Sequence, residues 1–227
     1  AKKRGLITDR NGNNLAIDTQ SISLYAYPKE YNLKKFTIQD MAEKISPILG
    51  EDISKVKEKL HTKKFLWLKR QMPVELRDKI KQLRIPGIGY APESKRVYPK
   101  KELAASLLGF TGIDNQGLTG IEHSFEDVLT GNNAPDKIFL DARGDEVLGI
   151  EGDKPNKTEK VKTNKVVLTL DENVQYIAER ELKEGLEKYK AKRGLVIVMD
   201  LDNGDLLALA TNPTYDPNYY SKAKWDV

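Results

Sequence analysis

The stretch RGLITDRNGNNLA occupies residues 4–16, close to the start of the 227-residue chain. The run Leu6–Thr8 favours an extended backbone, and Leu15-Ala16 begins a second apolar run. Between the two runs stands Asn11-Gly12, a pair typical of a two-residue type I′ turn, which needs a positive φ at both central residues. The stretch therefore predicts a β-hairpin with charged residues beside its turn.

The composition is that of a globular protein with a highly charged surface, because 39% of the residues are hydrophobic and 32% are charged. The formal net charge is +4, from 38 basic and 34 acidic side chains. The basic pairs are scattered along the chain: Lys34-Lys35, Lys63-Lys64, Lys69-Arg70 and Lys100-Lys101. This scatter favours a solvated surface over a nucleic-acid site. The chain has no cysteine, and its two histidines, His61 and His123, have no ligand spacing, so we expect neither a metal nor a cofactor.

Hydrophobic periodicity predicts several helices, over residues 37–49, 52–60, 74–84, 101–108 and 121–129. Thr37 is suited to cap the first helix and Gly50 to end it. A strand is expected at 65–68, and turns with short β runs are expected from Gly131 to Asp153. The polar segment 151–164 is typical of a linker or an exposed hairpin.

After this segment the pattern changes. A strand over 166–170 is followed by a helix that begins after Asp171 and ends at Gly194. Its predicted buried stripe is Val174, Ile177, Ala178, Leu182, Leu186 and Tyr189. The apolar run 195–199 predicts a strand covered on both faces, and the turn signal at 202–205 predicts a hairpin with 206–210. Two strands and one helix leave at least one sheet edge unpaired. The pattern predicts an α+β fold with two domains, residues 1–160 and 161–227.

Several motifs follow one another along the chain. They are Arg4-Gly-Leu-Ile-Thr-Asp-Arg-Asn-Gly12, Arg96-Val-Tyr-Pro99 with Leu103-Ala-Ala105 and Leu108-Gly-Phe110, Gly117-Leu-Thr-Gly-Ile-Glu122, Leu168-Thr-Leu-Asp171, Met199-Asp200 and Asp216-Pro-Asn218. In this order and spacing they resemble the class B penicillin-binding proteins, the monofunctional peptidoglycan D,D-transpeptidases. The stretch 109–117 is more similar to the division and sporulation branch (FtsI-like, SpoVD-like) than to the elongation branch.

The resemblance implies a non-catalytic pedestal of the dimerisation type over residues 1–160. Residues 161–227 would then be the first strand, helix and β-hairpin of a transpeptidase domain with the β-lactamase-like fold. The motif residues implied to hold the pedestal together are Arg4, Gly5, Asp9, Arg10, Gly12, Arg96, Tyr98, Pro99, Gly109, Gly117, Gly120 and Glu122. Their arginines are forked donors, and Asp9 and Glu122 are carboxylates suited to bidentate pairs. Which pairs form stays open, as does the alternative that these charges are separate surface groups.

The chemistry of this family needs the motifs Ser-x-x-Lys, Ser-x-Asn and Lys-Thr-Gly. Ser-x-x-Lys occurs at Ser54–Lys57 and Ser221–Lys224, but neither follows the family's pattern, and the other two motifs are absent. We therefore expect an enzymatic parent protein, a penicillin-binding serine transpeptidase, and no catalytic residue in this chain.

The resemblance also implies a place and partners. We expect the chain on the extracytoplasmic side of a bacterial membrane, tied to it by an N-terminal helix that precedes Ala1. The implied partners are a glycosyltransferase of the SEDS type (FtsW-like) and other division proteins, with peptidoglycan bound through the rest of the catalytic domain and no nucleic acid. Three alternatives stay open: an elongation-type transpeptidase, an acyl-transfer enzyme that uses Ser54 or Ser221, and a basic extracytoplasmic binding module.

Overall fold

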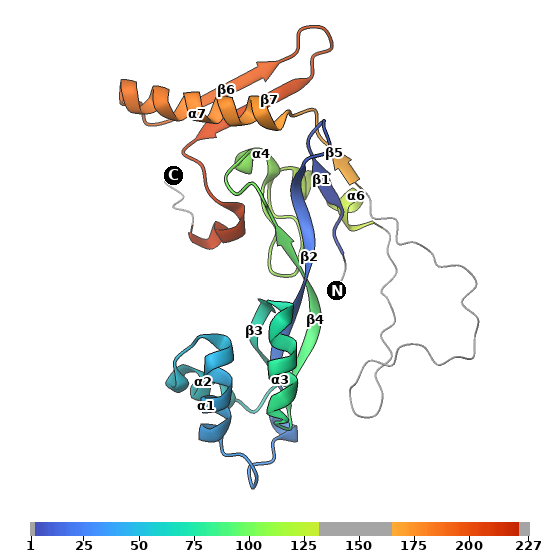
Figure 1. The fold of residues 1–227 in the computed structure, drawn as a ribbon, viewed down its shortest axis with the longest axis vertical. Helices are drawn as coiled ribbons and strands as arrows, with labels where there is room; N and C mark the ends of the chain where they lie inside the picture. Colours follow the sequence, from blue (N-terminus) through green and yellow to red (C-terminus); the bar gives the residue numbers. More distant parts are fainter. Residues whose placement is uncertain (1–2, 132–164, 223–227) are drawn as a thin grey trace, which may run out of the picture. The chain divides into compact units, whose positions relative to one another are not determined.

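The computed structural model describes residues 3–131 and 165–222, which form two compact units (Figure 1). The smaller unit comprises residues 18–96 and 113–115. The described part of the larger unit comprises residues 3–17, 97–112, 116–131 and 165–222. The predicted segments between Gly131 and Lys165, including the linker at 151–164, lie outside the described residues. The division at residue 160 stays a prediction, and the larger unit includes residues from both sides of it.

The smaller unit is a three-stranded sheet with helices packed against it. Its elements are β2 (Asn14–Ala26), which starts in residues of the larger unit, η1 (Pro28–Glu30), α1 (Ile38–Leu49), α2 (Ile53–Leu60), β3 (Leu66–Met72), η2 (Val74–Leu76), α3 (Arg77–Leu83) and β4 (Ile88–Val97). Both β3 and β4 pair with β2. The core between sheet and helices is apolar and includes Leu24, Met41, Ile45, Leu60 and Ile80. This unit therefore has its own hydrophobic core.

Local sequence signals explain α1 well. Thr37 accepts a hydrogen bond from the backbone N–H of Asp40, while the Asp40 carboxylate accepts one from the Thr37 N–H, which completes a capping box. Gly50 ends the helix in the left-handed conformation, at φ 64°. The predicted cap and stop are confirmed.

Two predictions in the smaller unit are wrong in detail. The helix expected over 74–84 is a 3₁₀ turn, η2, followed by the shorter α3. No strand was expected at β4, because Gly89 and Pro92 are poor strand residues. Since β4 pairs with β2 and with no other described strand, the missing N–H of Pro92 need not cost a ladder hydrogen bond.

The larger unit brings the start of the chain together with its last third. Its elements are β1 (Leu6–Thr8), α4 (Ala105–Leu108), α5 (Gly120–Ser124), α6 (Glu126–Thr130), β5 (Lys165–Val167), α7 (Glu172–Tyr189), β6 (Gly194–Met199), β7 (Leu206–Asn212) and η3 (Pro217–Lys222). Ile7 of β1 pairs with Ala16 of β2 in antiparallel fashion and with Val166 of β5 in parallel. A buried cluster that includes Ile7, Leu15, Tyr98, Leu129 and Leu170 fills this part of the unit.

The predicted hairpin at residues 4–16 is confirmed, but its two-residue turn is wrong. Because Thr8 pairs with Asn14, the loop has five residues, Asp9 to Asn13. Gly12 has a positive φ of 87°, whereas Asn11 is not among the residues with positive φ. The Asp9 carboxylate accepts hydrogen bonds from the N–H groups of Asn11 and Asn13, so this side chain organises the loop.

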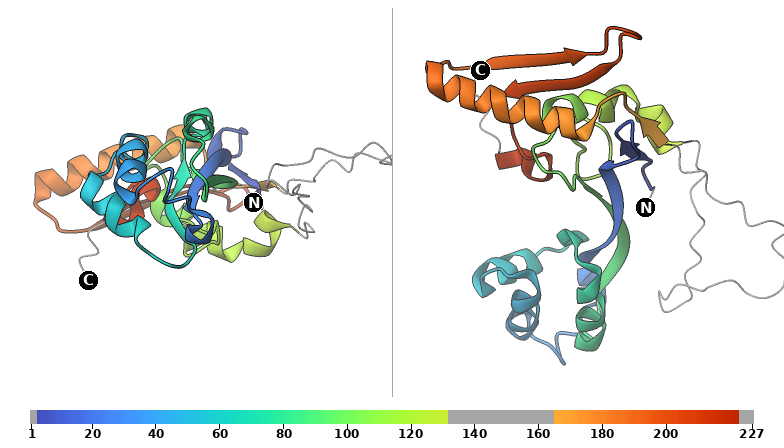
Figure 2. Two further views of the ribbon diagram at one scale, coloured as in Figure 1. Left: turned by 90° about the horizontal axis from the view of Figure 1, so that it is seen from below. Right: turned by 45° about the horizontal axis from the view of Figure 1, so that its top comes forward.

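Helix α7 lies along the antiparallel hairpin β6–β7, as Figures 1 and 2 show. The hairpin was predicted, and Gly204 at its turn has a φ of 78°. The helix ends at Tyr189 rather than at Gly194, because Lys190 takes the left-handed conformation that stops it. The helices expected over 101–108 and 121–129 are also shorter, since α4 begins at Ala105 and the second is split at Phe125.

The predicted burial of α7 and β6 is only partly correct. Ala178 is buried, but Ile177 is 49% exposed and Tyr189 is 75% exposed, whereas the polar Gln175 is only 1% exposed. Strand β6 alternates between half-buried and exposed residues, so it is not covered on both faces by the described residues. Among those residues, no helix has the length and apolarity needed to cross a bilayer.

Candidate functional site

A buried ion pair links the N-terminal segment to α5. The side chains of Arg4 and Glu122 are 1% and 0% exposed, and Nε of Arg4 donates to Oε2 of Glu122 at 2.5 Å. The same guanidinium donates to the main-chain oxygen of Glu122, and its Nη1 lies 2.7 Å from Oε2 of Glu126. The Tyr98 hydroxyl donates to Oε1 of Glu122 at 3.2 Å. Three motif residues from distant parts of the sequence therefore share one hydrogen-bonded cluster, which is what buried charges require.

The motif glycines allow close backbone contacts around this cluster. A Cβ at Gly117 would lie 2.1 Å from the main-chain oxygen of Glu122, and the Gly117 N–H donates to Glu126 at 2.8 Å. Gly109, at φ 74°, would place a Cβ 2.0 Å from the Thr119 oxygen. Two further motif glycines are Gly5, whose N–H donates to the Leu129 oxygen at 2.7 Å, and Gly120, the first residue of α5.

Asp9 is fully buried and accepts hydrogen bonds from two directions. Its Oδ1 accepts from the N–H groups of Asn11 and Asn13, and its Oδ2 accepts from the Asn13 side chain at 2.9 Å and from the Glu172 N–H at 3.2 Å. Burial alone would raise the pKa of Asp9, but these hydrogen bonds, the Asn13 side chain first, outweigh burial and lower the pKa below its ordinary value. The carboxylate thus ties the β1–β2 loop to the first residue of α7.

The β1–β2 loop and Asp171 together hold the N-terminus of α7. Asp171 is the N-cap residue and accepts from the N–H groups of Asn173 and Val174. The Asn11 amide donates to Asp171 at 3.0 Å, and this bond is the first cause of the lowered pKa of Asp171. The Arg10 N–H donates to the Leu170 oxygen at 2.9 Å. Two carboxylates at a helix N-terminus are also favoured by the helix dipole.

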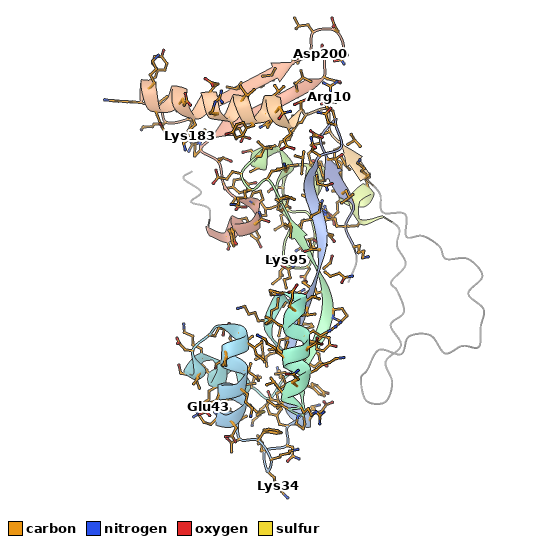
Figure 3. All side chains as sticks on the ribbon, in the orientation of Figure 1. Arg10, Lys34, Glu43, Lys95, Lys183 and Asp200 are labelled. Atoms are coloured by element: carbon orange, nitrogen blue, oxygen red, sulfur yellow. The ribbon has the colours of Figure 1, made fainter. Side chains whose placement is uncertain are left out.

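Arg10 reaches from this loop toward the turn of the β6–β7 hairpin. Figure 3 labels Arg10 and Asp200 at the same end of the larger unit. Nη2 of Arg10 lies 3.9 Å from Oδ2 of Asp205, and both side chains are about one-third exposed, at 37% and 33%. At this distance and exposure the pair contributes little stability.

Two motifs meet at Tyr98. The Tyr98 N–H donates to Oδ1 of Asn218 at 3.0 Å, and the Asn218 amide donates back to the Tyr98 oxygen at 3.0 Å. Asp216 accepts from both the N–H and the side chain of Asn218, which orients that amide. Pro99, the next motif residue, is exposed. The Arg-Val-Tyr-Pro and Asp-Pro-Asn motifs therefore contact each other directly, through Tyr98 and Asn218.

Arg96 belongs to the smaller unit and pairs there with Asp18. Nη1 of Arg96 lies 3.4 Å from Oδ1 of Asp18, and their side chains are 2% and 7% exposed. Oδ2 of Asp18 accepts from Ser94 at 2.6 Å and from Asn115 at 2.9 Å. Sequence reasoning missed Asp18, because a single carboxylate within a predicted β run carries no signal of its own.

The motifs match a known family. Residues 1–168 match the family described as the penicillin-binding protein dimerisation domain. The chain belongs to this family. The resemblance to class B penicillin-binding proteins and the α+β pedestal fold that it implied are thereby confirmed.

Relatives of this penicillin-binding protein chain are peptidoglycan transpeptidases by name. It is 35% identical over 222 residues to a probable peptidoglycan D,D-transpeptidase PenA of Neisseria meningitidis. This alignment covers 97% of the chain and 38% of the relative. It is 32% identical over 222 residues to the peptidoglycan D,D-transpeptidase FtsI of Escherichia coli, covering 96% of the chain and 37% of the relative. The chain thus spans less than two-fifths of these relatives. The solved complex between penicillin-binding protein PBP2 and MreC from Helicobacter pylori is similar in fold, with a TM-score of 0.63 and 25% identity over 95% of the chain and 42% of the matched chain.

The structure places both Ser-x-x-Lys serines of this penicillin-binding protein chain on exposed positions. Ser54 lies on the solvent side of α2, and Ser221 lies in η3. A penicillin-binding nucleophile needs a base and oxyanion donors around it. That this chain carries no catalytic residue stays a prediction. Within residues 3–131 and 165–222, no three His, Cys, Asp or Glu side chains are grouped so that they could hold a metal ion.

Proposed function

We propose that this chain is the non-catalytic pedestal of a D,D-transpeptidase that cross-links peptidoglycan in septal wall synthesis, together with the first elements of the catalytic domain. Its role is to position that domain and to dock partner proteins. The observation that carries this proposal is the hydrogen-bonded contact of Asp9 and Asn11 with Glu172 and Asp171 at the start of α7.

This contact suits a positioning role because its central carboxylate, that of Asp9, is buried and satisfied. Asp9 is fully buried and its carboxylate accepts four hydrogen bonds, one of them from α7. Lys100 adds an ion pair with Glu172, at 2.6 Å. A loop held by several charge-assisted hydrogen bonds sets the direction of the helix that starts on it. The twelve motif residues would then have a structural role, which is the role the resemblance implied.

The catalytic step belongs, in this proposal, to the complete protein. There the serine hydroxyl attacks a D-Ala carbonyl of a stem peptide, the motif lysine takes or relays its proton, and an oxyanion hole stabilises the intermediate. The chain carries neither Ser-x-Asn nor Lys-Thr-Gly. We propose an extracytoplasmic location with a membrane anchor outside this chain. We also propose partners that include an FtsW-like glycosyltransferase, and the solved complex of the Helicobacter pylori protein with MreC supports partner binding by a protein of this fold.

The test is intact mass after incubation with benzylpenicillin. The 227-residue chain is compared with the complete protein that contains it, and the variants Ser54→Ala and Ser221→Ala serve as controls. We expect one adduct on the complete protein, including both variants, and none on the chain. An adduct on the chain would refute its non-catalytic role, and its loss in one variant would identify the nucleophile. No adduct on either protein would refute the transpeptidase proposal.

A further inference from the structure

Gln175 is a buried polar residue of α7. Its side-chain amide makes the hydrogen bonds to β7 that a neighbouring strand would make. Gln175 as a whole is only 1% exposed. Oε1 accepts from the Leu209 N–H at 2.7 Å, and Nε2 donates to the Leu209 oxygen at 2.9 Å. One amide thus satisfies both backbone groups of one strand residue, which a residue on an adjacent strand would otherwise do.

The position of Leu209 in the hairpin explains why these groups need a partner. Leu209 pairs with Ile197 of β6. In an antiparallel pair the N–H and C=O of a residue point to the same side. Because both groups of Leu209 bond to Gln175, they point away from β6 and toward α7, which lies along the hairpin in the right view of Figure 2. Without the amide these partly buried groups would lose the partner that satisfies them.

The same amide continues to a second element through Glu179. Nε2 of Gln175 donates to Oε1 of Glu179 at 2.7 Å, and that oxygen also accepts the Ala104 N–H at 2.8 Å. Ala104 is 3% exposed and has a left-handed φ of 54°, directly before α4. Burial raises the pKa of Glu179, although both hydrogen bonds oppose this. A second contact, between the hydroxyls of Ser106 and Thr211 at 2.5 Å, joins α4 to β7 nearby.

We propose that Gln175 and Glu179 fix the position of the β6–β7 hairpin relative to the segment Ala104–Leu108. We call the chain of hydrogen bonds from Leu209 through Gln175 and Glu179 to Ala104 the positioning relay. The inference rests on the proposed function, in which α7 and the hairpin are the first elements of the catalytic domain. Both residues act through the backbone groups that they hold, and neither is assigned contact with substrate.

The hydrogen-bond pattern assigns a different requirement to each position. Position 175 must donate and accept at once, so only an amide of this length fits; a carboxylate there would face the Leu209 oxygen and Glu179 without a proton to donate. Position 179 only accepts in its bonds with Gln175 and Ala104, so Glu179→Gln keeps both of them. The relay therefore predicts that the two exchanges between Gln and Glu have unequal effects.

The test compares amide hydrogen exchange in the complete protein and in its variants. We expect Gln175→Met to speed exchange of the Leu209 amide about tenfold or more, because its N–H loses the acceptor that protects it. Glu179→Leu should speed exchange of Ala104 and leave Leu209 close to wild type. Glu179→Gln should leave both within about threefold. Gln175→Glu should lower the melting temperature, and adding Glu179→Gln should not restore it, because Leu209 would still lack a donor.

The matched control is Gln39→Met, because Gln39 donates to Glu43 at the same i, i+4 spacing on the exposed side of α1. It should change neither exchange at Leu209 nor the rate of acylation by benzylpenicillin. Gln175→Met should lower that rate several-fold at a temperature where the variant is folded.

Unchanged exchange at Leu209, or rescue of Gln175→Glu by Glu179→Gln, would overturn the relay. An unchanged acylation rate would overturn its positioning role. A wild-type protein that is not acylated refutes the proposed function, and exchange at Leu209 and Ala104 then decides the relay alone.

Discussion

Glu122→Leu is expected to destabilise the larger unit strongly, because it leaves a buried charge. The Arg4 side chain is 1% exposed and would lose the carboxylate that lies 2.5 Å from its Nε. Removing one partner of a buried pair costs about 3–5 kcal/mol of unfolding free energy. Glu126 lies 2.7 Å from Nη1 but its side chain is 34% exposed, so it offsets part of this cost. We therefore expect about 3 kcal/mol, which in a chain of this size lowers the melting temperature by about 6–12 °C.

The assay combines calorimetry with hydrogen exchange of α5 and β1. Because both elements belong to the larger unit, exchange follows its unfolding separately from that of the smaller unit. Tyr98→Phe removes only the hydroxyl that donates to Glu122, and it should cost about 1 kcal/mol. Arg180→Ala is the matched surface control, because its pair with Glu181 is 50% and 58% exposed; it should change stability by less than about 0.5 kcal/mol. The double variant Arg4→Met/Glu122→Leu should be less destabilised than the sum of its single variants. Additive costs, or a Glu122→Leu cost no larger than that of Arg180→Ala, would refute the reasoning.

Three further outcomes follow from the same geometry. The pKa of Asp9 is lowered from its ordinary 3.8, so its carboxylate stabilises the fold above about pH 4, and this contribution is lost as the pH falls through the folded-state pKa. Asp9→Asn should therefore reduce the dependence of the unfolding free energy on pH, as measured by urea unfolding between about pH 2 and 6. Gly117→Ala should cost about 2–3 kcal/mol, since its Cβ would lie 2.1 Å from the Glu122 oxygen, and a neutral result in thermal unfolding would contradict that contact. Gly185→Ala should instead stabilise α7 by about 0.5–1 kcal/mol in the same measurement, because a Cβ there meets nothing within 4 Å.

Elements with strong local signals could be predicted from the sequence. Helix α1 has a Thr37 cap and a Gly50 stop, and both act as their residue types suggest. The two hairpins were located by their Asn-Gly pairs, although the first turn is longer than expected because Asp9 bonds across the loop. Strand β4 was missed because its glycine and proline oppose a strand locally, while pairing with β2 supports one.

The partners of the motif residues could not be predicted, since they depend on contacts between distant segments. Arg4 and Glu122 are 118 residues apart, and Asp18 and Arg96 are 78 apart. Gln175 illustrates the same limit on a helix. Periodicity assigns the inner face of α7 to apolar residues, so a glutamine there is expected at the surface. It is buried because β7 presents an N–H and a C=O that an apolar side chain could not satisfy.

These long-range bonds also bear on the domain boundary predicted at residue 160. Composition changes near residue 160, and a chain divided there would separate Asp9 from Glu172, Asn11 from Asp171 and Ala104 from Glu179. All six groups lie in the larger unit, where the pedestal motifs hold the first helix after the change. A helix whose N-terminus is held by another segment loses those hydrogen bonds when the segment is removed. We therefore expect α7 and its hairpin to be less stable when expressed without residues 3–17 and 97–131 than when these segments are present, which circular dichroism of the two proteins would measure.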